Sequence, residues 1–98
     1  MSGTEFETAA QAALARLRAT LEDDVDLDVE EKGDGVIEIA FDDGSKIIIN
    51  RHSAAQEIWV AARSGGFHFH WRDGQWRNTR DGSELFASVA SLIAAQRG

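Results

Sequence analysis

The sequence predicts an α+β fold, a two-layer α/β sandwich in which both terminal helices pack on one face of an antiparallel sheet. Three observations lead to this prediction. Apolar residues recur with a helical period at both ends of the chain and with a period of two between them. Turn signals rich in Gly, Asp and Ser separate the period-two segments. The links are too short for the crossover that parallel strands need, so neighbouring strands must be antiparallel.

The first element is a helix predicted over residues 4–22. Thr4 and Glu7 have the spacing of a capping box, in which each side chain accepts a hydrogen bond from the other residue's backbone N–H. The apolar residues that follow have helical spacing, so they form one stripe along the helix. They are Phe6, Ala10, Ala13, Leu14, Leu17 and Leu21.

From residue 25 the apolar period changes to two. Val25, Leu27 and Val29 alternate with acidic residues, which predicts a half-buried strand. Gly33-Asp34-Gly35 is a turn signal, and Asp73-Gly74 reads as a tight hairpin turn. Five further strands are predicted over 36–41, 46–51, 56–63, 67–71 and 75–78.

The last element is a helix that opens after Asp81-Gly82-Ser83 and runs to about Gln96. The order is therefore one helix, five or six strands and a second helix. The 98 residues allow one domain, which we place at 1–98.

Composition excludes several classes of protein. The chain has no cysteine, which excludes disulfides, thiolate-bound metals and a cysteine nucleophile. No apolar run approaches the roughly 20 residues of a membrane span, and the N-terminus lacks the pattern of a signal or transit peptide. We therefore expect a soluble, cytoplasmic chain that does not bind membranes. Without a nucleophile elbow or a phosphate-binding glycine loop, an enzyme is not expected.

The charge is unevenly distributed. The formal net charge is −7, but residues 1–49 hold 13 acids and 4 bases, whereas residues 50–98 hold 4 acids and 6 bases. An acidic domain is a poor partner for nucleic acid, because phosphates must be neutralised by clustered Lys and Arg. The acidic half suits cations or a basic protein surface instead.

Seven carboxylates fall within residues 22–31. We expect Asp26, Asp28 and Glu30 on one face of a strand, about 6–7 Å apart, beside the acids that end the first helix. Three interpretations are open: a solvated edge that resists aggregation, a weak and exposed surface for hard cations, or a docking site for a basic protein. The seven are Glu22, Asp23, Asp24, Asp26, Asp28, Glu30 and Glu31.

Two histidines share a face of the strand predicted over 67–71. A His-x-His pair such as His68 and His70 can form part of a Zn, Cu or Fe site. No third ligand is evident nearby in the sequence, and His52 could approach only through the fold. Surface histidines on the open side of the sheet are therefore the favoured interpretation.

Trp59 is a candidate for protein recognition. It alternates with Ile58 and Val60, so it faces outward if these two face the helices. An exposed tryptophan on a sheet is a candidate binding hot spot, unless long neighbouring side chains cover it. Asn50 and Arg51 are polar and close by, which suggests a recognition patch rather than a pocket.

Three segments together resemble the central signature of the frataxin family, in particular of its bacterial members. The resemblance implies an iron-binding protein of iron–sulfur cluster assembly that binds Fe(II) or Fe(III) weakly. It implies an iron donor, or an iron-dependent regulator, of the complex between a cysteine desulfurase and its scaffold protein. The segments are Gly44-Ser45-Lys46-Ile47-Ile48-Ile49-Asn50-Arg51, Glu57-Ile58-Trp59-Val60-Ala61-Ala62 and Gly65-Gly66-Phe67-His68-Phe69.

The resemblance also implies functional residues. The partner-binding residues are expected to be Asn50, Arg51 and Trp59, with Glu30 and Glu31 from the acidic segment. The chain departs from the family where His52 to Ala55 lack the usual proline, and where His70 replaces a common acid. The metal-binding residues are expected to be Glu22, Asp23, Asp24, Asp26 and Asp28, with Glu7 from the first helix.

Several alternatives stay open at this point. Exposed carboxylates discriminate poorly between metals, so other divalent cations are possible ligands. We expect a monomer, which metal could drive into oligomers. The alternative to an iron protein is a module without metal whose acidic face docks a basic partner.

Overall fold

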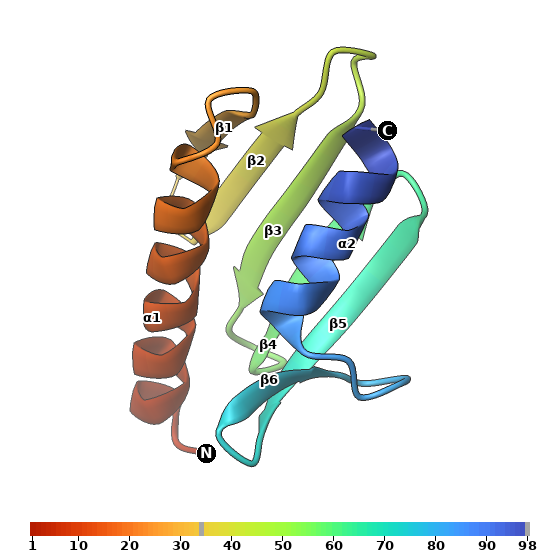
Figure 1. Ribbon diagram of the computed structural model, residues 1–98. Coiled ribbons are helices and arrows are strands. Elements are labelled where there is room, and N and C mark those ends of the chain that lie inside the picture. The colour runs from red at the N-terminus through yellow and green to blue at the C-terminus, as the bar shows by residue number, and fades with distance from the viewer. Residues whose placement is uncertain (34, 98) are drawn as a thin grey trace.

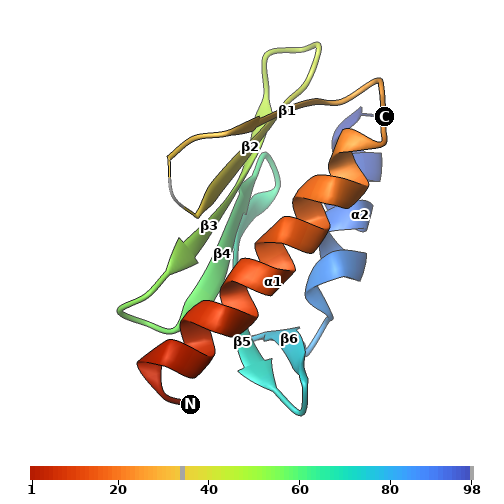
Figure 2. The ribbon, with the colours of Figure 1, turned by 90° about the vertical axis from the view of Figure 1, so that its left-hand side faces the viewer.

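The computed structural model describes residues 1–33 and 35–97, which form two helices and a six-stranded antiparallel sheet. The spatial order of the strands is their order in the sequence. Both helices lie against the same face of the sheet (Figure 1, Figure 2), so the predicted α+β sandwich is confirmed. The elements are α1 (Gly3–Glu22), β1 (Asp28–Glu31), β2 (Val36–Ala40), β3 (Lys46–His52), β4 (Glu57–Ala62), β5 (Gly65–Arg72), β6 (Gln75–Asn78) and α2 (Leu85–Arg97).

The α1 helix is capped at an earlier residue than the sequence suggested. Ser2, not Thr4, is the N-cap: its side chain accepts from the Glu5 backbone N–H at 3.1 Å, and the Glu5 carboxylate accepts from the Ser2 N–H at 3.2 Å. These hydrogen bonds lower the pKa of Glu5. Ser2 and Glu5 have the same spacing as Thr4 and Glu7, and the sequence could not rank the two pairs.

The β1 strand begins three residues later than the alternation predicted. Val25 is 93% exposed and lies in a turn rather than in a strand. The Asp24 side chain accepts from the Asp26 N–H at 3.0 Å, and the Asp24 carbonyl accepts from the Leu27 N–H at 3.1 Å. A side-chain-capped turn of this kind competes with strand pairing, which is why the alternation misled at this point. The turn predicted at Gly33-Asp34-Gly35 falls partly outside the described residues.

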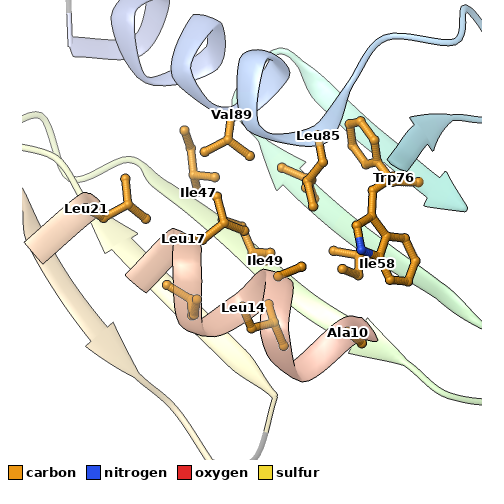
Figure 3. Close-up of a cluster of buried hydrophobic side chains, with 14 of the residues drawn as sticks. Ala10, Leu14, Leu17, Leu21, Ile47, Ile49, Ile58, Trp76, Leu85 and Val89 are labelled. Carbon is orange, nitrogen blue, oxygen red and sulfur yellow. The ribbon is translucent and has the colours of Figure 1, made fainter. Parts of the chain in front are cut away.

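The core lies between the helices and one face of the sheet (Figure 3). The predicted stripe of α1 is buried, and it meets Ile47, Ile49 and Ile58 from the central strands. Leu85 and Val89 of α2 lie on the same face of the sheet and complete the core beside α1. Every second residue of the strands is used in this way, so the remaining residues form an open face on the far side of the sheet. No helix among the described residues is long and apolar enough to cross a membrane.

Candidate functional site

The seven carboxylates of residues 22–31, here called the acidic strip, run from the end of α1 through a turn into β1. Six of them are exposed and Asp24 is half-buried. Asp23 is the C-cap of α1, where a negative charge opposes the helix dipole. The chain therefore keeps a local charge density that is unfavourable for folding.

Four members of the acidic strip are paired with cations. The hydrogen bond to Glu22 raises the pKa of Arg18, and the hydrogen bond to Glu30 raises the pKa of Lys32. The pairs are Arg18–Glu22 at 2.9 Å, Arg18–Glu31, Lys32–Glu30 at 2.6 Å and Arg97–Asp24 at 3.0 Å.

The other three members, Asp23, Asp26 and Asp28, are exposed and make no side-chain hydrogen bond or ion pair within the described residues. Carboxylate oxygens are the ligands that hard cations prefer. No three carboxylate or imidazole groups of the described chain converge on one point as a metal site. The arrangement can therefore offer separate oxygen ligands on an exposed surface, but not a closed cage.

Glu7 does not join the acidic strip. It lies on α1 about 22 Å from Glu22 along the helix axis, at the rise of an α-helix. Its carboxylate accepts from the Ser53 hydroxyl at 2.7 Å and pairs with Arg51 at 3.2 Å. These contacts fix the start of α1 to the end of β3, so we assign Glu7 a structural role.

One carboxylate near the acidic strip could not be found from the sequence. The pairing of Asp28 with Ala40 brings the β2–β3 turn beside the strip, and Asp26, Asp42 and Asp43 line one shallow hollow. The Asp43 carboxylate already accepts hydrogen bonds from Ser45, and these lower its pKa. It also pairs with Arg63 at 2.7 Å. Asp42 is exposed. Only the strand register reveals that it belongs here.

The open face of the sheet carries a stack of three rings. The Trp59 indole lies between the imidazoles of His52 and His68, with ring centroids 3.8 and 4.5 Å away and nearly parallel planes. Its Nε1–H donates to Glu57 Oε1 at 2.8 Å. Trp59 does face away from the helices as predicted, but these neighbours leave it half-buried.

The predicted recognition residues are divided between the two faces. Asn50 pairs with Trp59 in the strand register and shares the open face with it. Arg51 pairs with buried Ile58, points toward the helices and is only 12% exposed in its side chain. The expectation that Arg51 shares a surface with Trp59 is therefore wrong, because successive strand residues point to opposite faces. Glu31 is likewise on the helix side, paired with Arg18, whereas Glu30 is on the open face.

Comparison with known proteins places this geometry in a family. The model of the frataxin-like domain matches residues 1–98. An "Iron-sulfur cluster assembly protein CyaY" of Dechloromonas aromatica is 54% identical over 99 residues, covering 100% of this chain and 94% of the relative.

Solved structures agree on the fold. The frataxin of Psychromonas ingrahamii has a TM-score of 0.88 at 26% identity, covering 98% of this chain and 91% of its own. Trimeric frataxin from the yeast Saccharomyces cerevisiae, complexed with ferrous iron, has a TM-score of 0.77 at 24% identity, covering 89% and 83%. The family model and the full-length relative show that this chain belongs to the frataxin family.

Proposed function

We propose that the chain binds iron weakly on the acidic strip and works with the proteins that assemble iron–sulfur clusters. The observation that carries the proposal is the group of three exposed carboxylates, Asp23, Asp26 and Asp28, which form no ion pair or side-chain hydrogen bond within the described chain. Their oxygen atoms suit Fe(II) and Fe(III). The name of the 54% identical relative supports the pathway.

Weak binding follows from the geometry of the acidic strip. Separate, solvated carboxylates supply one oxygen ligand each, and water completes the coordination of the ion. Such iron exchanges quickly, which suits an iron donor or an iron-dependent regulator better than a store. We assign the protein no catalytic residues, and we place it in the cytoplasm with its bacterial relatives.

The partners we propose are the cysteine desulfurase and its scaffold protein. The acidic strip would meet a basic surface, so the affinity should fall as ionic strength rises. Asn50, Trp59 and Glu30 on the open face would provide a second contact. Iron bound at the strip would change the charge that the partner meets, which couples iron to docking.

The first test is an anaerobic titration of isotope-labelled protein with Fe(II), followed through the amide NMR signals. We expect selective broadening of residues 22–28. The triple variant Asp23→Asn, Asp26→Asn, Asp28→Asn should weaken Fe(II) binding by about tenfold or more, which is ~1.4 kcal/mol of binding free energy. The matched control is Asp73→Asn, an exposed aspartate in the β5–β6 turn at the other end of the molecule (Figure 1), which should bind iron normally.

Binding to the desulfurase is then measured with and without Fe(II). If the triple variant broadens as the parent does, iron is not held by these carboxylates and the proposal is wrong. If the variant loses the partner while iron has no residue-specific effect, the acidic strip is a docking surface without a metal role.

A further inference from the structure

Trp59, which the proposed function assigns to docking, is enclosed by two imidazole rings on the open face. His52 of β3 stacks on one side of the indole with ring centroids 3.8 Å apart, and His68 of β5 stacks on the other side at 4.5 Å. The planes of these rings are inclined to the indole by only 11° and 9°. A partner therefore reaches the edge of the indole but neither of its faces, unless one imidazole moves away.

The His52 ring is held in place as a neutral imidazole. Its Nδ1 accepts a hydrogen bond from the Ala55 backbone N–H at 3.3 Å, which requires a lone pair on that nitrogen. Protonation places a hydrogen on Nδ1, so two N–H groups then oppose each other and this hydrogen bond is lost. We expect the ring to swing away from Trp59 once it is no longer fastened to Ala55.

The turn that carries Ala55 leaves room for this movement. It connects β3 to β4, and both Ser53 and Ala55 are exposed. Gln56, which ends the turn, has a φ of 54°, in the left-handed region that residues other than glycine seldom adopt. Its N–H donates to the Ser53 carbonyl at 3.1 Å. The turn is therefore strained and faces solvent, and the His52 ring can leave the stack without disturbing the core.

The His68 ring is held by a different group. Its Nδ1 lies 3.6 Å from Glu57 Oε1, and the same oxygen accepts from the Trp59 Nε1–H at 2.8 Å. A protonated His68 directs an N–H and a positive charge at this carboxylate, which turns a long contact into a charge-assisted one. An indole attracts a protonated imidazole on either of its faces, so that attraction does not distinguish the two histidines. Ala55 and Glu57 do.

Other charged groups on the open face leave this difference intact. Lys46 and Glu38 neutralise each other at 2.7 Å. Arg77 lies opposite His70 and donates to the Gly82 carbonyl and to Gln75. Within the described residues Glu57 forms no ion pair with His52, so its charge acts on the His68 side of the stack. The titratable and charged groups that face the stack from β2 to β6 are thus Glu38, Lys46, Glu57, His70 and Arg77.

We propose that His52 is a pH-sensitive cover of Trp59: its protonation uncovers one face of the indole, while the other face stays on His68. Histidine is the side chain whose charge ordinarily changes between about pH 5 and pH 8. The role of this cover rests on the proposed function, in which Trp59 contacts an assembly partner. The uncovered face offers the partner the contact that His52 otherwise occupies.

The test is a titration of the isotope-labelled full chain from about pH 8 to about pH 5.5, followed through the NMR signals of the imidazoles and of the Ala55 amide. Stacking on an indole shifts ring hydrogens upfield. We expect His52 to lose this shift with the same midpoint at which the Ala55 amide signal changes, while His68 keeps it. His70 makes no ring contact in the described chain, so it reports the effect of protonation alone. The far-UV circular dichroism should stay constant.

A variant without the cover connects the stack to docking. His52→Ala uncovers Trp59 without adding a charge, so at pH 8 it should bind the desulfurase about two- to tenfold more tightly than the parent, the contribution of one stacked ring pair. The matched control is His70→Ala, which removes a histidine of the same face that covers no ring. It should gain no affinity.

The outcomes separate the cover from the docking role of Trp59. If His52 and His68 both keep their upfield shifts at the lowest pH, the stack does not respond to protonation and the inference is wrong. If both lose them together, Glu57 does not hold His68, and a one-sided cover is equally wrong. If His52 alone responds but His52→Ala binds the desulfurase no more tightly than the parent, the pH-sensitive cover is supported and the proposed docking role of Trp59 is overturned.

Discussion

The two faces of the sheet are built from the same strands but are held in order by different interactions. On the helix-covered face, Ile49, Ile58 and Phe69 are fully buried, so each is fixed by many apolar contacts at once. On the open face, Trp59 is fixed by two stacked rings and one hydrogen bond. The first kind of order is collective and the second is local. Stability and recognition can thus be carried by alternate residues of one strand and be changed separately.

The sharpest test of this difference is the pair of neighbours Ile58 and Trp59. Ile58→Ala leaves a cavity in the core and should cost about 2–5 kcal/mol of unfolding free energy. Trp59→Ala removes a larger side chain that is held by two stacked rings and one hydrogen bond, and it should cost about 1–3 kcal/mol, less than Ile58→Ala. Urea unfolding of both variants measures the two values. A larger loss for Trp59→Ala would mean that the open face also contributes collectively to the fold.

A second pair of neighbours, Asn50 and Arg51, sharpens the comparison for recognition. Arg51→Gln breaks the ion pair between β3 and α1 and should cost about 1–2 kcal/mol, with little direct effect on partner binding. Asn50→Ala should leave stability within about 0.5 kcal/mol while weakening the binding of the assembly partners. Thermal unfolding and a binding titration, made on the same two variants, give both readouts. The opposite division of effects would contradict the assignment of Arg51 to the helix-covered side.

The smallest expected effect concerns the acidic strip, whose negative charges lower the unfolding free energy of the protein. Asp23 sits at the C-terminal end of α1 with no cation of its own in the described chain. Asp23→Asn should therefore raise the unfolding free energy by about 0.3–1 kcal/mol at low salt, by relieving the helix dipole and like-charge repulsion. The gain should shrink as salt is added. A gain that persists undiminished at high salt would mean that the charge of Asp23 is not its cause.

The boundaries that the sequence pattern misplaced have one physical origin. The two-residue period was correct from Val36 onward but failed at Val25, because the Asp24 side chain caps a turn that no periodicity records. The capping box was displaced along the chain, because Ser2–Glu5 and Thr4–Glu7 satisfy the same rule. Local hydrogen bonds of single polar side chains therefore decided both boundaries, whereas the apolar pattern decided the elements themselves.

The candidate site shows the same division. The acidic strip could be predicted as a run of charges, but its free members could not be identified, because Asp24 is neutralised by Arg97 from the other end of the chain. The sequence likewise placed His68 and Trp59 on strands without showing that they stack. That contact depends on the register of β4 with β5, and the register would shift if the loop between these strands were one residue longer or shorter.

The sequence by itself determined the α+β sandwich, the buried stripe of α1, the alternation of the strands and the acidity of the first half, since each depends on residues a few positions apart. Only the tertiary structure decided that Arg51 faces Glu7 and that His52, Trp59 and His68 form one stack. Those contacts join residues from separate elements. Strand register and the position of each helix on the sheet decide which residues meet, and local periodicity encodes neither of them.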